Sequence, residues 1–149
     1  MENDIKYMKK ALEQAKKAEK KHDFPVGCVI VHKNKIVSKA YNKKEKNKIA
    51  TKHAEIIAIE KACKKLKTWH LDDCTLYTTL EPCVMCSGAI IQSRIKKVVY
   101  ATKNENFGAV ESNYNIFDNM IRKKKIIFIT NVCKMESENI LTRFFKNIR

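Results

Sequence analysis

Apolar residues recur every three or four positions in several segments of this chain, which is the period of a helix that buries one face. The first such segment places Met8, Leu12 and Ala15 among lysines and glutamates. Pro82 can open a later helix because proline is tolerated in a first turn, and Ser137 is the expected N-cap of the last one. The predicted helices span residues 8–20, 54–65, 82–93 and 137–147.

Shorter apolar runs rich in β-branched residues predict strands, and turn residues separate them. The segment 24–27, with its proline and glycine, ends the first helix, and Asn34 between charged residues marks a hairpin turn. The stretch 41–52 is polar and rich in lysine, which predicts a loop. The predicted strands span residues 26–31, 36–41, 75–79, 97–101 and 126–130.

Strands that alternate with helices predict one α/β domain over residues 1–149, a layered sheet with helices on both faces. Two connections have the pattern of right-handed crossovers, one through helix 54–65 and one through helix 82–93. The N-termini of such helices open on one edge of the sheet. Polar residues at the starts of these two helices are therefore expected to converge.

Composition predicts a cytoplasmic protein with reduced cysteines. Residues 1–6 lack the apolar core of a signal peptide, and no apolar run approaches the roughly 20 residues that cross a bilayer. The net charge of +15 suits a nucleic-acid partner. However, only four of the 31 cationic residues are arginine and the chain is rich in Asn and Ile, so the bias of an AT-rich genome explains the charge equally well.

Three potential metal ligands and one carboxylate stand at the two helix starts. His53 is followed two residues later by Glu55, while Cys83 and Cys86 are three residues apart, so both sulfurs face the same way. In a first helical turn, the dipole and the unpaired N–H groups favour thiolate over thiol. Three protein ligands leave a fourth position for water, which is the layout of a catalytic zinc site rather than a structural one.

Zinc in such a site lowers the pKa of its water from 15.7 to roughly 7. His53 and Glu55 point in different directions on a helix, so the carboxylate is free to move protons instead of binding the metal. Glu55 is expected to take a proton from the water as hydroxide attacks, and to return it to a departing nitrogen. This chemistry is hydrolytic deamination, which needs the shuttle because a free amide ion cannot leave.

The residues alone leave two other interpretations of the cysteine pair open. A C-x-x-C pair in a cytosolic protein can be a redox pair, and zinc can be structural if Cys63, Cys74 or His70 supplies a fourth ligand. The cysteines outside the pair are otherwise expected to be small buried residues, and His22, His32 and His70 to be surface or loop residues.

The segments His53-Ala54-Glu55 and Pro82-Cys83-Val84-Met85-Cys86 resemble the H-x-E and P-C-x-x-C signature of zinc-dependent nucleobase deaminases. Within that superfamily the chain is most similar to the bacterial tRNA-specific adenosine deaminases, which convert the wobble adenosine of an anticodon to inosine. Further segments that resemble this family are 24–27, 41–42, 79–89, 93–95 and 144–146.

The resemblance implies a cytidine-deaminase-like α/β/α sandwich with a five-stranded mixed sheet, a homodimer, one zinc ion per subunit and attack on C6 of adenine. It makes Glu55 the catalytic residue and His53, Cys83 and Cys86 the metal ligands. Asn42 would hydrogen-bond the flipped base. The substrate-binding residues that it implies are Asn42, Phe24, Pro25, Val26, Ala54, Asn104, Phe144 and Phe145.

The chain departs from this family in two loops. Ile49-Ala50-Thr51 stands where relatives usually have Asp-Pro-Thr. The run 103–108 replaces the acidic residue, lysine and Gly-rich bend that often follow the fourth strand. That second segment helps to contact RNA in the family.

The C-terminal segment has its own features of an RNA-binding surface. Arg143, Lys146 and Arg149 surround Phe144 and Phe145, which suits base stacking combined with phosphate contact. One of the two rings is expected to pack inside, because adjacent helical residues point about 100° apart. An anticodon loop is already single-stranded, so extruding a base from it costs little.

Three hypotheses for function follow. The first is deamination of the wobble adenosine in a tRNA anticodon stem-loop. The second is deamination of a free base or nucleoside, such as guanine or cytosine, by the same zinc site. The third is a non-catalytic, zinc-stabilised RNA-binding domain.

Overall fold

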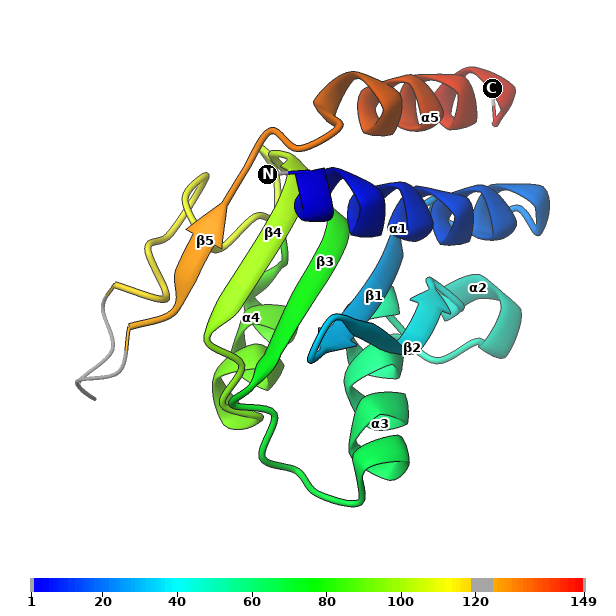
Figure 1. Ribbon diagram of the computed structural model, residues 1–149. Helices are drawn as coiled ribbons and strands as arrows, with labels where there is room; N and C mark the ends of the chain where they lie inside the picture. The colour runs from blue at the N-terminus through cyan, green and yellow to red at the C-terminus, as the bar shows by residue number, and fades with distance from the viewer. Residues whose placement is uncertain (1, 119–124, 149) are drawn as a thin grey trace.

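Five strands form one mixed sheet between two layers of helices in the computed structural model, which describes residues 2–118 and 125–148 (Figure 1). The order of the strands across the sheet is β2-β1-β3-β4-β5, and the expected α/β sandwich is confirmed. The strands are β1 (Gly27–His32), β2 (Lys35–Tyr41), β3 (Cys74–Leu80), β4 (Lys97–Thr102) and β5 (Ile127–Ile129). The helices are α1 (Glu2–Lys20), α2 (Lys44–Asn47), α3 (Ala54–Leu66), α4 (Val84–Gln92) and α5 (Lys134–Asn147).

The sheet topology brings the starts of α3 and α4 together. β1 pairs antiparallel with both β2 and β3, whereas β3, β4 and β5 run parallel. β2, β3 and β4 therefore share one direction, and the helices that follow β2 and β3 begin at the edge where these strands end. The hairpin predicted at Asn34 is confirmed, since Lys33 and Asn34 have φ angles of 49° and 62°, as in a type I′ turn.

Each face of the sheet buries its own hydrophobic cluster. Ile30 of β1 belongs to the cluster that includes residues of α3 and α4, while the preceding residue, Val29, belongs to the cluster that includes residues of α1 and α5. Figure 1 shows α1 and α5 on one side of the sheet and α3 and α4 on the other. Gly27 lies so close to α1 that a Cβ there would overlap the backbone oxygen of Ala11. Among the described residues, no helix has the length and apolar character needed to cross a membrane.

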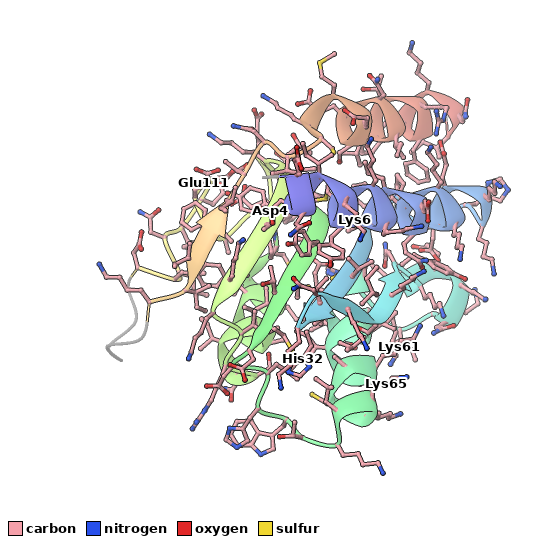
Figure 2. All side chains as sticks on the ribbon, in the orientation of Figure 1. Asp4, Lys6, His32, Lys61, Lys65 and Glu111 are labelled. Carbon is pink, nitrogen blue, oxygen red and sulfur yellow. The ribbon has the colours of Figure 1, made fainter. Side chains whose placement is uncertain are left out.

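The first helix begins at Glu2, six residues before the predicted start. Asp4 ties this extra turn to the sheet, because the Tyr77 hydroxyl donates to its carboxylate at 2.6 Å and the Lys97 ammonium lies 3.4 Å away (Figure 2). Acidic residues in a first turn also suit the helix dipole.

The stretch predicted as a loop at 41–52 contains the short helix α2. Its capping groups come from outside the helix. Asp23 is buried, and its two carboxylate oxygens accept the backbone N–H groups of Glu45 and Lys46 at 2.9 and 3.0 Å. Asn42 Oδ1 accepts the N–H of Lys44 at 3.2 Å. A carboxylate 22 residues away thus supplies the cap that the local sequence lacks.

The starts of two helices differ from the prediction. Pro82 lies before α4 rather than in its first turn, and Cys83 is the N-cap residue. α5 begins at Lys134, preceded by Cys133 in a left-handed conformation, so Ser137 is not its N-cap. Ser137 is buried inside the helix, and its hydroxyl donates to the Thr79 carbonyl at 2.6 Å. This serine therefore docks α5 on the end of β3.

Candidate metal centre

His53 and Cys83 hold the same position relative to their helices. Each is the N-cap residue, with φ −75° and ψ 153° at His53 and φ −75° and ψ 178° at Cys83. Cys86 follows in the first turn of α4. Because α3 and α4 begin at the same edge of the sheet, the three side chains meet although His53 and Cys83 are 30 residues apart.

The spacing of the three ligand atoms fits one tetrahedral zinc ion. His53 Nδ1 lies 3.6 Å from Cys83 Sγ and 3.5 Å from Cys86 Sγ, and all three atoms lie within 4.8 Å of one another. Zn–N bonds of about 2.0 Å and Zn–S bonds of about 2.3 Å place N and S about 3.5 Å apart around a tetrahedral ion. The predicted zinc site is therefore confirmed as a group placed to bind one ion, and it contains three ligands among the residues that the structure describes.

Hydrogen bonding within this group favours thiolate at Cys83. Contacts with Cys86 and then His53 lower the pKa of the Cys83 thiol to about 4, although burial opposes the shift. The shared hydrogen bond, together with burial, raises the pKa of Cys86. The contact with Cys83 also raises the pKa of His53. A deprotonated sulfur, the form that binds metal, is thus readily available at the start of α4.

Glu55 lies in the first turn of α3, beside the ligands but outside the ligand group. Its side chain is buried, with 4% of the residue exposed. Burial raises the pKa of its carboxyl to about 7, against the opposing effects of its own backbone N–H and of His53. A carboxyl that titrates near neutrality suits proton transfer in both directions.

Asn42 links two segments beside the metal group. Its Nδ2 donates to the Phe24 carbonyl at 3.3 Å, and its Oδ1 accepts the Lys44 N–H. A carboxamide has two donor hydrogens and two acceptor lone pairs, so one of each remains for a ligand. The other predicted pocket residues on these segments, Pro25, Val26 and Ala54, are buried.

Three phenylalanine rings connect the segment before β1 with α5. The Phe24 ring centroid lies 5.8 Å from that of Phe144 and 5.7 Å from that of Phe145, both edge-to-face. Phe145 is nevertheless 47% exposed. The sequence predicted that one of the two α5 rings packs inside; Phe144 is the less exposed of the two, and both rings contact Phe24.

The predicted phosphate contact of Arg143 requires a correction, because its guanidinium already forms an ion pair with a carboxylate of this chain. Its Nε and Nη2 donate to the two carboxylate oxygens of Glu19 on α1 at 2.7 and 2.6 Å. The arginine predicted to contact phosphate therefore fastens α5 to α1. Lys146 is exposed, as predicted, and Arg149 lies outside the described residues.

Glu81 is the residue of this region that the sequence analysis missed. It is 1% exposed, and its carboxylate accepts five hydrogen bonds from the segment 104–112. The donors are the backbone N–H groups of Asn104, Val110, Glu111 and Ser112 and the hydroxyl of Ser112.

The segment held by Glu81 lies against the metal ligands. Gly108 forms a backbone bridge with Cys83, and the Ala109 N–H donates to the Pro82 carbonyl at 2.9 Å. A Cβ at Gly108 would overlap the Glu81 carboxylate. The neighbouring Glu111, labelled in Figure 2, accepts the Tyr100 hydroxyl at 2.5 Å. Asn104 has its side chain in this segment, where Oδ1 accepts the Phe107 N–H at 3.2 Å.

The residues considered for a closed structural site do not join the ligand group. Within the part of the chain that the structure describes, that group contains His53, Cys83 and Cys86, and neither Cys63, Cys74 nor His70 belongs to it. Cys28 and Cys74 are buried as expected, whereas Cys63 and Cys133 are partly exposed. Among the other histidines, His22 and His70 are exposed and His32 is intermediate.

Comparisons with known proteins agree with this geometry. Residues 1–102 match the family model for the cytidine and deoxycytidylate deaminase zinc-binding region. A tRNA-specific adenosine deaminase of Aquifex aeolicus (strain VF5) is 42% identical over 143 residues, 96% of this chain and 94% of that protein. A solved structure from studies of A-to-I editing by tRNA:A34 deaminases at the wobble position matches with a TM-score of 0.86 at 33% identity, over 90% of this chain and 97% of the other. The guanine deaminase of Bacillus subtilis matches less closely, with a TM-score of 0.65 at 31% identity, over 82% of this chain and 98% of the other.

Proposed function

The chain belongs to the zinc-binding deaminases, among the tRNA-specific adenosine deaminases, and on that premise we propose that Glu55 carries protons while the wobble adenosine of an anticodon becomes inosine. The observation that supports this most directly is the ligand group of His53, Cys83 and Cys86 with a buried carboxyl beside it. The overall reaction adds water to adenosine and yields inosine and ammonia.

The proposed proton path uses one carboxyl twice. A zinc ion held by the three ligands supplies the Lewis acid that activates water at neutral pH. Glu55 accepts a proton from the water as its oxygen bonds to C6 of adenine, and then delivers a proton to the amino nitrogen on that carbon. The C6–N bond breaks and ammonia leaves, and the hydroxyl proton on C6 moves to N1, which gives the carbonyl of inosine.

The proposed binding of the base uses groups that are already held in place. The free donor and acceptor of Asn42 can meet the edge of a flipped purine, and the Phe24 ring lies at the contact between this segment and α5. A base in a single-stranded loop reaches such a pocket at low cost, because it does not have to leave a duplex.

One experiment tests the proposed function. The purified, zinc-loaded protein is incubated with a wobble-adenosine anticodon stem-loop and, separately, with free adenosine, guanine and cytosine. Inosine formed in the stem-loop and no ammonia from the free compounds is the expected result. Ammonia from a free base without inosine in RNA would replace the proposal with the free-base deaminase, which the similarity to a guanine deaminase supports. Binding of RNA without any turnover would favour the non-catalytic domain.

We also propose that the active form is a cytoplasmic homodimer. Two large apolar side chains next to the metal ligands are exposed: Val84, which follows Cys83, is 51% exposed, and Phe107, which precedes the Gly108 that bridges Cys83, is 72% exposed. Clustered apolar exposure favours a protein–protein contact. Light scattering after size exclusion should give twice the chain mass of 17.3 kDa, and Val84→Asp should shift it toward the monomer. A wild-type protein of single-chain mass at micromolar concentration would contradict the dimer.

A further inference from the structure

Two lysines lie against the ring of Tyr41, at the end of β2, and a third lies on α2 close by. Lys21 Nζ lies 5.5 Å from the ring centroid and Lys43 Nζ lies 4.9 Å from it. The Lys21 ammonium, with smaller contributions from Lys43 and Lys46, lowers the pKa of the Tyr41 phenol. Lys46 lies on the neighbouring helix α2, where its backbone N–H donates to the Asp23 carboxylate, two residues after Lys21, at 3.0 Å. We call Lys21, Lys43 and Lys46 the lysine cluster.

The lysine cluster lacks the carboxylate partners that other lysines have. Lys10, Lys52 and Lys97 each lie within 4.0 Å of a carboxylate, at Glu13, Glu60 and Asp4. Within residues 2–118 and 125–148, no such ion pair involves a member of the cluster.

Three acidic residues lie within two positions of a cluster lysine in the chain, and in the described residues none forms an ion pair with it. Glu19 is paired with Arg143 instead. Asp23 is buried, and its two oxygens accept the N–H groups that cap α2. Glu45 is exposed on α2 and is the one acidic residue of the run 43–52, which contains five lysines. Like charges held together in this way cost free energy until an anion lies between them.

The cluster lies next to the segments that form the metal centre. Tyr41 directly precedes Asn42, whose side chain holds the Phe24 carbonyl. The Lys43 N–H donates to the Lys52 carbonyl at 2.9 Å, one residue before the ligand His53. Figure 1 shows the C-terminal end of α1, where Lys21 follows, on the same side of the molecule as α2 and the C-terminal end of α5. The lysine cluster therefore adjoins, along the backbone, both Asn42 and the ligand His53.

We propose that Lys21, Lys43 and Lys46 bind backbone phosphate of the RNA whose base enters the metal centre. This inference rests on the proposed function and adds to it the place where the backbone is held. Lysine suits the role because its ammonium is a compact charge that contacts phosphate without reading sequence. The face of the Tyr41 ring attracts the Lys21 and Lys43 ammonium groups and keeps these two side chains together. The contact fixes the strand and leaves the choice of base to the pocket.

The test compares two double variants of equal charge. Lys21→Gln with Lys46→Gln removes the two exposed members of the cluster, and Lys64→Gln with Lys65→Gln removes two exposed lysines near the end of α3. Figure 2 shows Lys65 on α3, well away from α2 in this view. The measured quantity is the Kd for the anticodon stem-loop between 50 and 200 mM salt, with turnover of that RNA recorded separately.

A phosphate contact to a single strand contributes about 0.7 to the slope of log affinity against log salt. The Lys21/Lys46 double variant should therefore reduce the slope by about 1.4. The factor by which this variant binds RNA more weakly than the wild type should then be about sevenfold smaller at 200 mM salt than at 50 mM salt. The Lys64/Lys65 control should keep the wild-type slope. Equal slopes in the two double variants, or a wild-type slope in both, would overturn the proposal. RNA binding that depends on the cluster without any deamination would overturn the proposed function and leave the phosphate contact supported.

Discussion

Glu55 is placed where one side chain can both take and give a proton. It is buried beside the ligands, and burial brings the pKa of its carboxyl to about 7. Glu55→Gln keeps the size of the side chain and removes this proton transfer. We expect kcat on the stem-loop to fall by about 10²- to 10⁴-fold or more, since general acid–base catalysis contributes that much. Single-turnover assays of inosine formation measure the loss.

Metal analysis provides the control for this substitution. Glu55 lies outside the ligand group, so the glutamine variant should retain one zinc per chain, whereas Cys83→Ala should lose it. A glutamine variant that keeps both its zinc and appreciable turnover would exclude the shuttle role. An alanine variant with full zinc occupancy would contradict the ligand assignment.

The four residues of this centre could be predicted because their information is local. His53 and Glu55 are two residues apart, Cys83 and Cys86 are three apart, and each pair stands at a helix start. Glu81 could not be identified in the same way, because its donors lie 23 to 31 residues further along the chain. The only local signal was an acidic residue at the end of an apolar strand, directly before a proline.

At the level of elements, Glu81 decides whether the segment 104–112 keeps its shape. Three backbone N–H groups converge on Oε2, and Asn104 N–H with the Ser112 hydroxyl meets Oε1. Glu81→Gln turns one of these acceptors into an NH₂ group that faces donors. Because hydrogen bonds to a charged group contribute about 1.5–3 kcal/mol each, the free energy of unfolding should fall by roughly 2–4 kcal/mol. Urea denaturation measures this change.

A control for this substitution is available in the same segment. Glu105 is exposed, and Glu105→Gln should change the free energy of unfolding by less than about 0.5 kcal/mol. If Glu81→Gln is as stable as this control, the carboxylate does not organise the segment. A stability loss accompanied by full zinc content would show that the segment and the metal centre can be separated.

The pairing of α1 with α5 should depend on pH through Glu19. The Arg143 guanidinium lowers the pKa of the Glu19 carboxyl below its usual 4.5. A lowered pKa in the folded state means stabilisation above the ordinary pKa, which is lost as the pH falls through the lowered value. The pair is partly exposed, so Arg143→Gln should cost no more than about 1 kcal/mol near pH 7.

The loss in free energy of unfolding caused by Arg143→Gln should disappear when Glu19 is protonated. Urea denaturation of the wild type and of Arg143→Gln at pH 6 and at pH 3.5 gives the comparison, and the difference between the two proteins should shrink at the lower pH. The double variant with Glu19→Gln and Arg143→Gln should lose no more free energy of unfolding than either single variant. A difference that stays constant with pH would show that Arg143 acts through packing alone.

Element boundaries were less predictable than the elements themselves, and the reasons are contacts distant in sequence. α2 depends on the Asp23 carboxylate, so the lysine-rich run 41–52 gave no sign of a helix. The start of α5 was placed at Ser137 because serine is a common N-cap. In the folded protein that hydroxyl is used by the Thr79 carbonyl, a tertiary contact that no local pattern encodes.

For the whole molecule, the layers followed from the alternation of strands and helices, but the order of strands did not. Insertion of β1 between β2 and β3 makes α3 cross over a strand before the chain returns in β3. Each face then buries a separate apolar cluster, with Ile30 in one and Val29 in the other. Neither cluster includes the ligands His53, Cys83 or Cys86, so we expect the core to assemble without a metal.

Removal of zinc should therefore abolish turnover without unfolding the chain. A domain of 149 residues buries enough surface to fold by its own core, unlike a zinc finger, which is unfolded without metal. Binding still adds stability by linkage, about 2.7 kcal/mol at a free zinc concentration of 100 times Kd. That corresponds to a fall of roughly 5–10 °C in Tm on chelation, with the far-UV circular dichroism retained.

A Cys83→Ala/Cys86→Ala protein should show no response to the chelator. Loss of the far-UV signal on chelation of the wild type would mean that the metal, rather than the two clusters, holds α3 and α4 on the sheet.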